Sequence, residues 1–207
     1  TSERLDVPTG TTRPWDSQPW QLVSGFRFQE GKERALYDAG IRLRLDADAP
    51  VDGGGASLAL MVPEGFRGDP VRVGYWLHSG QEADWPRFKT GASYTVKLWL
   101  KQEGLASGRA QVRVGQLHSE VLTVGDEWQE YSFEFIGGPP EPGFPAERFD
   151  IAIAEPGTLF IDNVSIFEKD GPPPYGFYPE VIETLKRFTP STLRLWVLQD
   201  NNGYVVR

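Results

Sequence analysis

The sequence contains no cysteine, and this absence narrows the chemistry open to it. None of the 207 residues can form a disulfide, a thiolate metal site or a cysteine nucleophile. Histidine is scarce too, because His78 and His118 are the only two. Two histidines alone make no convincing zinc site or catalytic triad. We therefore interpret each as an ordinary surface residue, unless a ligand lies beside it.

Long apolar runs and basic runs are also missing. No stretch approaches the roughly 20 apolar residues that a membrane helix needs. The formal net charge is −8, without a run of Lys and Arg, so the basic face typical of nucleic-acid binders is absent. Nucleic acid and anionic membrane surfaces are therefore disfavoured as partners. An acidic protein suits neutral ligands better than anionic ones.

The chain is instead rich in aromatic residues, 13% of the total with seven Trp, and in period-two alternation. The clearest example is SYTVKLWLK, where Tyr94, Val96, Leu98 and Leu100 alternate with polar residues and a Trp. About nine or ten such segments follow one another, the first placed in ALYDAGIRLRLDAD, residues 35–48. Half-buried alternation is typical of antiparallel strands with one wet face. We predict an all-β fold, an antiparallel β-sandwich of jelly-roll type.

The pattern changes after residue 169. DGPPPYGFYP, residues 170–179, is rich in Pro and Gly and is typical of a linker. PEVIETLKRF then has helical spacing, with Pro179 at the first position and an apolar stripe. STLRLWVL alternates as a short strand. We predict three parts: a β-sandwich over 1–169, a linker over 170–179 and a helix–strand tail over 180–207.

Three stretches resemble strands of carbohydrate-binding modules of families 4, 9 and 22. They are SYTVKLWLKQEGL, GDEWQEYSFEF and GTLFIDNVSIF, in the same order and at similar spacing. The resemblance covers residues 88–168 well and 20–87 poorly. It implies a galactose-binding-like jelly roll in a secreted or cell-surface protein that binds polysaccharide.

The tail resembles the entry to the catalytic domain of family 51 α-L-arabinofuranosidases. DNVSIF is followed by a linker, a helix and then STLRL, although the Pro-Gly-Gly that follows in that family is missing here. The resemblance implies the N-terminal part of a longer glycoside hydrolase, with the start of a (β/α)8 barrel, which needs about 250 residues. The two carboxylates that hydrolyse a glycosidic bond would lie in that missing catalytic domain, a partner of this chain. We therefore expect no enzymatic activity from the chain itself.

Five residues are candidates for ligand binding. A glycan site typically contains exposed aromatic rings flanked by polar groups, because the C–H faces of sugars stack on the rings while their hydroxyl groups form hydrogen bonds. Trp76 and Trp99 fall on the polar faces of their strands, and they would line one groove if those strands sit in one sheet. Trp85, in EADWPRF, falls in an expected loop, and Arg72 and His78 flank Trp76. Burial in a core or an interface would explain any one of these Trp residues as well.

A metal site is expected at Asp162. The alternation of TLFIDNVSIF is interrupted at Asp162 and Asn163, and this indicates a β-bulge. In the resembling modules the matching Asp binds a structural Ca²⁺, with backbone carbonyls and an acidic residue near the N-terminus, and oxygen ligands suit that ion. By that resemblance Glu30 is the partner, one place later than in the family. The alternative is an aspartate that only accepts bonds from the amides of the bulge.

Two functions fit these observations. The first is a non-catalytic carbohydrate-binding module of a glycoside hydrolase that degrades plant polysaccharide, binding a neutral chain such as xylan, arabinan or β-glucan. The second is a structural β-sandwich brace for the hydrolase domain, with no glycan binding of its own. They differ in whether an exposed Trp lies in a groove or is covered.

Overall fold

The computed structural model describes residues 16–17, 20–23, 30–50, 56–76, 88–138, 148–171, 183–184 and 186–187. The chain divides into two compact units, Thr1–Lys169 and Asp170–Arg207. All of the described strands lie in the first unit.

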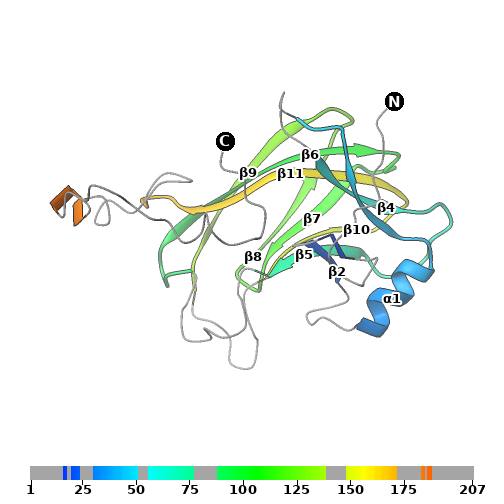
Figure 1. Cartoon of the computed structure of the whole chain (residues 1–207), viewed down its shortest axis with the longest axis horizontal. Coiled ribbons are helices and arrows are strands. Elements are labelled where there is room, and N and C mark those ends of the chain that lie inside the picture. Colours follow the sequence, from blue (N-terminus) through cyan, green and yellow to red (C-terminus); the bar gives the residue numbers. More distant parts are fainter. Residues whose placement is uncertain are drawn as a thin grey trace. The chain divides into compact units, whose positions relative to one another are not determined.

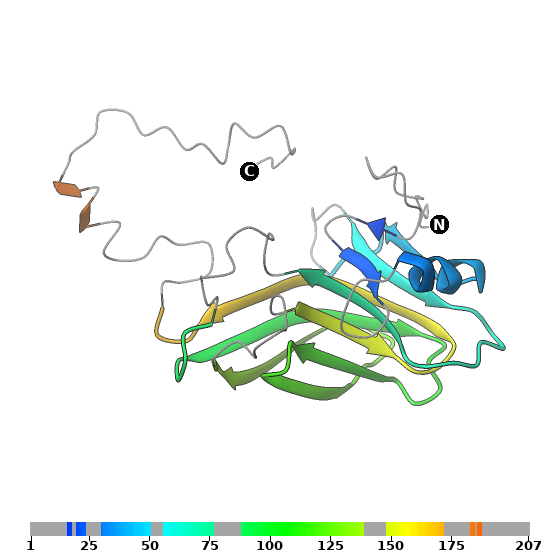
Figure 2. The ribbon, with the colours of Figure 1, turned by 90° about the horizontal axis from the view of Figure 1, so that it is seen from below.

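These strands form two antiparallel sheets (Figure 1). The six-stranded sheet contains β1 (Asp16–Ser17), β2 (Trp20–Val23), β5 (Val71–Trp76), β10 (Arg148–Ile153), β7 (Arg109–Val114) and β8 (His118–Thr123), in that spatial order. The five-stranded sheet contains β3 (Arg42–Asp46), β4 (Ser57–Val62), β11 (Gly157–Glu168), β6 (Ser93–Glu103) and β9 (Gln129–Ile136). Figure 2 shows the same strands from a second side. The arrangement is an antiparallel β-sandwich of jelly-roll type, and the predicted fold class is confirmed.

The core lies between the sheets and comes from the alternating strands. In β6 the buried residues are Tyr94, Val96, Leu98 and Leu100, the face that the alternation predicts. From the other sheet, β7 and β10 contribute Val112, Val114, Phe149, Ile151 and Ile153. Burying such a side chain stabilises the fold by about 1.5–3 kcal/mol. Polar side chains are left to the outer faces of the sheets, where a ligand site can lie.

Helix α1, Glu30–Asp38, was not predicted from the sequence, whereas the alternation of residues 41–46 is confirmed as β3. EGKERALYD is rich in strong helix formers. Gly40 ends the helix with a φ of 92°, and the Ile41 N–H donates back to the Leu36 carbonyl at 3.1 Å. This is the Schellman cap, which favours Gly at the left-handed position. The strand can therefore begin only after the cap.

The structure describes little of the second unit. Residues 183–184 and 186–187, inside the expected helix, are helical, and Lys186 pairs with Glu183 at 2.8 Å. The rest of the expected helix, most of the linker and the expected strand lie outside the described residues, so the assignment of this tail to a catalytic barrel stays a prediction. Among the described residues, no helix is long and apolar enough to cross a membrane.

Candidate functional site

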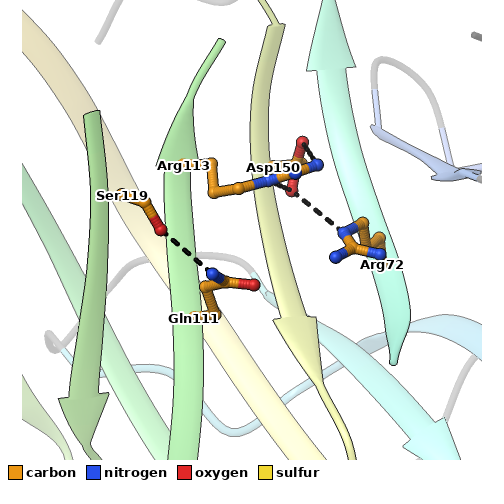
Figure 3. A network of polar contacts seen from close by, with 5 residues as sticks. All are labelled: Arg72, Gln111, Arg113, Ser119 and Asp150. Carbon is orange, nitrogen blue, oxygen red and sulfur yellow. Dashed lines mark hydrogen bonds and ion pairs between the residues drawn. The ribbon is translucent and has the colours of Figure 1, made fainter. Parts of the chain in front are cut away.

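The outer face of the six-stranded sheet carries polar contacts in two groups, Arg72–Asp150–Arg113 and Gln111–Ser119 (Figure 3). Strand register places Asp150 of β10 between Gly74 of β5 and Arg113 of β7. Ser119 of β8 continues the same row beyond Arg113. Because residues paired across antiparallel strands share a face, this row crosses four neighbouring strands on the side away from the core.

Asp150 is the centre of the network. Arg113 donates from Nε to Oδ1 at 3.0 Å and from Nη2 to Oδ2 at 2.8 Å, a bidentate pair of the strong, charge-assisted kind. Arg72 approaches the same carboxylate from β5, with its Nε 3.7 Å from Oδ1. The Asp150 residue is 2% exposed. Two guanidinium groups therefore share one carboxylate that is almost completely shielded from water.

Arg72 is held more loosely than Arg113. Its Nε has no hydrogen-bond partner, and 18% of its side chain is exposed. Burial lowers the pKa of Arg72, the positive charge of Arg113 lowers it further, and Asp150 and Asp69 act in the opposite direction. A guanidinium nevertheless stays protonated at neutral pH. Arg72 is thus a partly buried cation with a hydrogen-bond donor still unused.

Gln111 and Gly74 shape the rest of this face. The Gln111 Nε2 donates to Ser119 Oγ at 3.0 Å, which holds the amide between β7 and β8. Gly74 places no side chain at the position opposite Asp150. The face is therefore polar, and hydrogen bonds within it hold its side chains in place. At Gly74 the row of side chains has a gap. Such a surface suits a ligand with many hydroxyl groups, which both donate and accept.

Among the predicted ligand residues, Arg72 and Trp76 lie on this sheet. Both belong to β5, and Trp76, its last residue, is paired with Arg148 of β10. The side chain of Trp76 lies outside the described part of the structure, and so do His78 and Trp85 as whole residues. Their contacts with a ligand stay predictions.

Trp99 lies on the other sheet, which corrects the expectation of a shared groove. It belongs to β6, where it is paired with Asp162 and Glu130, whereas Trp76 belongs to β5 of the six-stranded sheet. Two residues on different sheets of a sandwich cannot line one groove on a single sheet. Alternation places a residue on a polar face, but it does not say which strands become neighbours.

A second polar cluster lies on the outer face of the five-stranded sheet, around Lys101 of β6. Its Nζ donates to Asp48 Oδ2 at 2.7 Å, and Trp128 Nε1 donates to Asp48 Oδ1 at 3.1 Å. The hydrogen bond between Lys101 and Asp48 lowers the pKa of Asp48 and raises the pKa of Lys101. Trp128 also meets Phe160 edge-on, with 6.3 Å between ring centroids. We assign this cluster a structural role, because it fastens the segment after β3 to the sheet.

The bulge predicted at Asp162 is present. The pairing of β11 with β6 shifts register between Asp162 and Ser165, and Asn163 has a left-handed φ of 48°. The Asn163 N–H donates to Asp162 Oδ1 at 2.7 Å. Partial burial raises the pKa of the Asp162 carboxyl, and the bond from Asn163 opposes this shift.

The Ca²⁺ assignment stays a prediction. Glu30, the predicted partner of Asp162, is the first residue of α1, and its side chain lies outside the described part of the structure. Among the residues that are described, no three His, Asp or Glu side chains gather as a metal site. Asp162 begins the bulge, in which Asn163 is the left-handed residue, and its carboxylate supplies the oxygen ligands that such a site would use.

Sequence reasoning missed Asp150, Arg113 and Gln111. A signal was present, because RFDIAIA places Asp150 between the apolar residues Phe149 and Ile151, on a strand whose other charged residue is Arg148 at its start. A carboxylate in such a strand is expected to have a cationic partner. The partner could not be named, because the pairing of β10 with β5 and β7 joins segments far apart in the sequence.

The sequence matches no protein-family model and no curated protein. Among solved structures, an arabinose-bound α-L-arabinofuranosidase of family GH51 aligns with a TM-score of 0.53 at 19% identity, over 84% of this chain and 27% of that one. An exo-β-agarase aligns with a TM-score of 0.50 at 11% identity, over 77% and 24%. A family 4 carbohydrate-binding module aligns with a TM-score of 0.46 at 17% identity, over 63% and 92%. The first two alignments support the β-sandwich fold.

Proposed function

We propose that this chain is a non-catalytic module that binds polysaccharide through the outer face of its six-stranded sheet. The observation that carries the proposal is the polar network on that face, in which Asp150 and Ser119 hold the side chains of Arg113 and Gln111. Glycan sites combine a few placed polar groups with aromatic or apolar surface. A set of guanidinium and amide groups on a rigid sheet supplies the polar part.

Order in the network favours binding. Immobilising a flexible side chain when a ligand binds costs about 0.5–1.5 kcal/mol, and Arg113 and Gln111 are already fixed by hydrogen bonds to neighbouring strands. In the proposed complex Arg72 and Gln111 bond sugar hydroxyls, and Trp76, at the end of β5, stacks on a sugar ring. His78 and Trp85, from the segment after β5, are proposed as further contacts.

The main chain of the bound polysaccharide is proposed to be neutral, as in xylan, arabinan or β-glucan. The net charge of −8 repels a ligand that carries a negative charge on every sugar, such as pectin. Neutral chains meet no such repulsion.

We further propose that the module belongs to a secreted or cell-surface glycoside hydrolase that degrades plant polysaccharide. The chain spans 27% of the arabinofuranosidase and 24% of the agarase, so the matching region is a small part of each of those longer chains. A catalytic domain would then be the partner of this module, and the module itself would hydrolyse nothing.

The rival function is a structural brace, and the burial of Asp150 favours it. A carboxylate that is 2% exposed between two guanidinium groups can also serve only to join β5, β10 and β7. In that case the same face binds no glycan, and the hydrolase domain is the only partner.

Affinity electrophoresis against xylan, arabinan, β-glucan and cellulose separates the two functions. We expect at least one neutral polysaccharide to retard the chain. Trp76→Ala should weaken binding at least about tenfold, since a stacking platform at a hot spot contributes a few kcal/mol.

Trp99→Ala, the matched control, removes a Trp side chain from the five-stranded sheet. We expect it to weaken binding less than Trp76→Ala does. A larger loss from Trp99→Ala would move the site to the five-stranded sheet. Absence of retardation by every polysaccharide in the panel would leave the brace as the function. Circular dichroism and the melting temperature check that each variant is folded.

A further inference from the structure

We propose that this face recognises a carboxylate-bearing substituent on an otherwise neutral polysaccharide, through the guanidinium of Arg72. The ligand class is a chain of neutral sugars with isolated uronic acid branches. This inference rests on the proposed function, because it uses the same sheet face. It adds a charged group to the ligand, which the acidic composition of the chain argues against at first sight.

The charge on this face is opposite to the charge of the whole chain. Among the side chains that the structure describes on the outer face of β5, β7, β8 and β10, the charged ones are Arg72, Arg109, Arg113 and Asp150. Three cations therefore face one anion, in a chain whose formal net charge is −8. Complementary local charge of this kind fixes specificity more than overall affinity.

Within the network, the uncompensated charge lies at Arg72. Arg113 occupies both oxygens of Asp150, at 3.0 and 2.8 Å, whereas Arg72 reaches that carboxylate only at 3.7 Å and leaves its Nε without a hydrogen bond. A buried donor without a partner is unfavourable. The Nε atom itself is buried, so a ligand carboxylate would bond the two Nη groups at the exposed end of the side chain, because guanidinium groups bind carboxylates with two parallel hydrogen bonds.

The surroundings of Arg72 agree with this assignment. Arg113 is among the causes that lower the pKa of Arg72, after desolvation, so a second anion beside the pair would relieve repulsion between the two cations. Asp150 would oppose such an anion only weakly, since its own charge is offset by the bidentate bond from Arg113. Gly74 lies between Asp150 and β2 in the same row and carries no side chain, so it adds no group that would block a ligand beside Arg72.

Screening explains how an acidic protein can accept an isolated acid but not a polyanion. At physiological ionic strength the Debye length is about 8 Å, so a single carboxylate at Arg72 interacts mainly with the local cations. A chain with a carboxylate on every sugar extends past this distance and meets the net negative charge of the protein. The neutral main chain of the proposed function and its acidic branch are therefore compatible.

The test uses two ligands that differ only in charge: a xylo-oligosaccharide with one glucuronic acid branch, and the same oligosaccharide with the carboxyl group reduced to an alcohol. Isothermal titration calorimetry should give about tenfold tighter binding of the acidic ligand. Its Kd should rise with salt, while the Kd of the reduced ligand stays flat. Arg72→Gln should bring the ratio of the two Kd values close to one.

Arg109→Gln, on the same face but at the start of β7, is the matched control and should leave the ratio largely intact. Equal binding of the two ligands by the unmodified chain overturns this inference and leaves the proposed function standing. The same holds if neither ligand binds while another polysaccharide of the panel does. If no glycan binds at all, the proposed function fails as well. Should Arg72→Gln not fold, the salt dependence of the unmodified chain still decides.

Discussion

At the scale of single residues, two aspartates show how burial decides the contribution of an ion pair to stability. Asp150 is shielded from water and bonded by Arg113 beside a second guanidinium. Asp48 pairs with Lys101 at 2.7 Å, but its side chain is 35% exposed. Water competes for the second pair and hardly reaches the first. Removing a partner from a buried pair leaves an uncompensated charge, whereas an exposed ion can simply be hydrated.

Asp150→Ala should therefore lower the free energy of unfolding by about 3–5 kcal/mol. It leaves the cations of Arg72 and Arg113 facing each other on a desolvated sheet. Asp48→Ala, the comparison at a less buried pair, should cost less, about 1–2 kcal/mol, because Asp48 also accepts the hydrogen bond from Trp128. Urea denaturation followed by circular dichroism measures both. Equal losses would show that the network on the six-stranded sheet is as well hydrated as the surface pair.

At the scale of elements, β11 carries the feature that matters most for a metal. Its register shift between Asp162 and Ser165 interrupts an otherwise regular ladder with β6. The raised pKa of Asp162 means that the folded state disfavours its charged form. Relative to an unfolded pKa of about 3.9, stability is then greatest below that value and falls as the pH rises through the folded pKa. A cation bound to the carboxylate would reverse this effect.

Calcium is accordingly expected to raise the melting temperature at neutral pH, because it binds the folded state only, and a chelator should reverse the rise. Asp162→Asn should abolish the response. Without metal this variant should be no less stable than the original chain, since it removes a desolvated charge. Asp126→Asn, a substitution of an exposed carboxylate, is the control and should keep the calcium response. If neither calcium nor the chelator changes the melting temperature, Asp162 binds no metal and only accepts the hydrogen bond from the Asn163 N–H.

At the scale of the whole molecule, the proposed module should release no reducing sugar from any polysaccharide of the panel. Hydrolysis of a glycosidic bond needs a carboxylic acid and a carboxylate at a set separation. Asp150 and Asp48, the two aspartates of the described polar clusters, are occupied as hydrogen-bond acceptors of Arg113 and Lys101. A reducing-sugar assay on the purified chain checks this. Activity that disappears when one acidic residue of this chain is replaced would contradict a non-catalytic role.

The sequence predicted local features of the fold better than their assembly. Alternation identified the buried face of β6, and the slip at Asp162 identified the bulge, because both are properties of one continuous segment. The sequence analysis did not predict helix α1, which ends at the Gly40 cap directly before the alternating stretch. The Arg72–Asp150 contact was out of reach, because it depends on which strands pair, and pairing is decided by the whole core.

The Arg72–Asp150–Arg113 network also bears on how the chain folds. Its members come from β5, β10 and β7, and Asp150 lies 37 residues from Arg113 in the sequence. The network can form only after both of these long-range pairings have closed, and such topologies fold slowly, in milliseconds to seconds. We expect an interaction that needs both pairings to be absent from the transition state, and therefore to act on the unfolding rate and hardly on the folding rate. On that expectation, Asp150→Ala should speed unfolding while leaving the refolding rate almost unchanged, as stopped-flow measurements in urea would show.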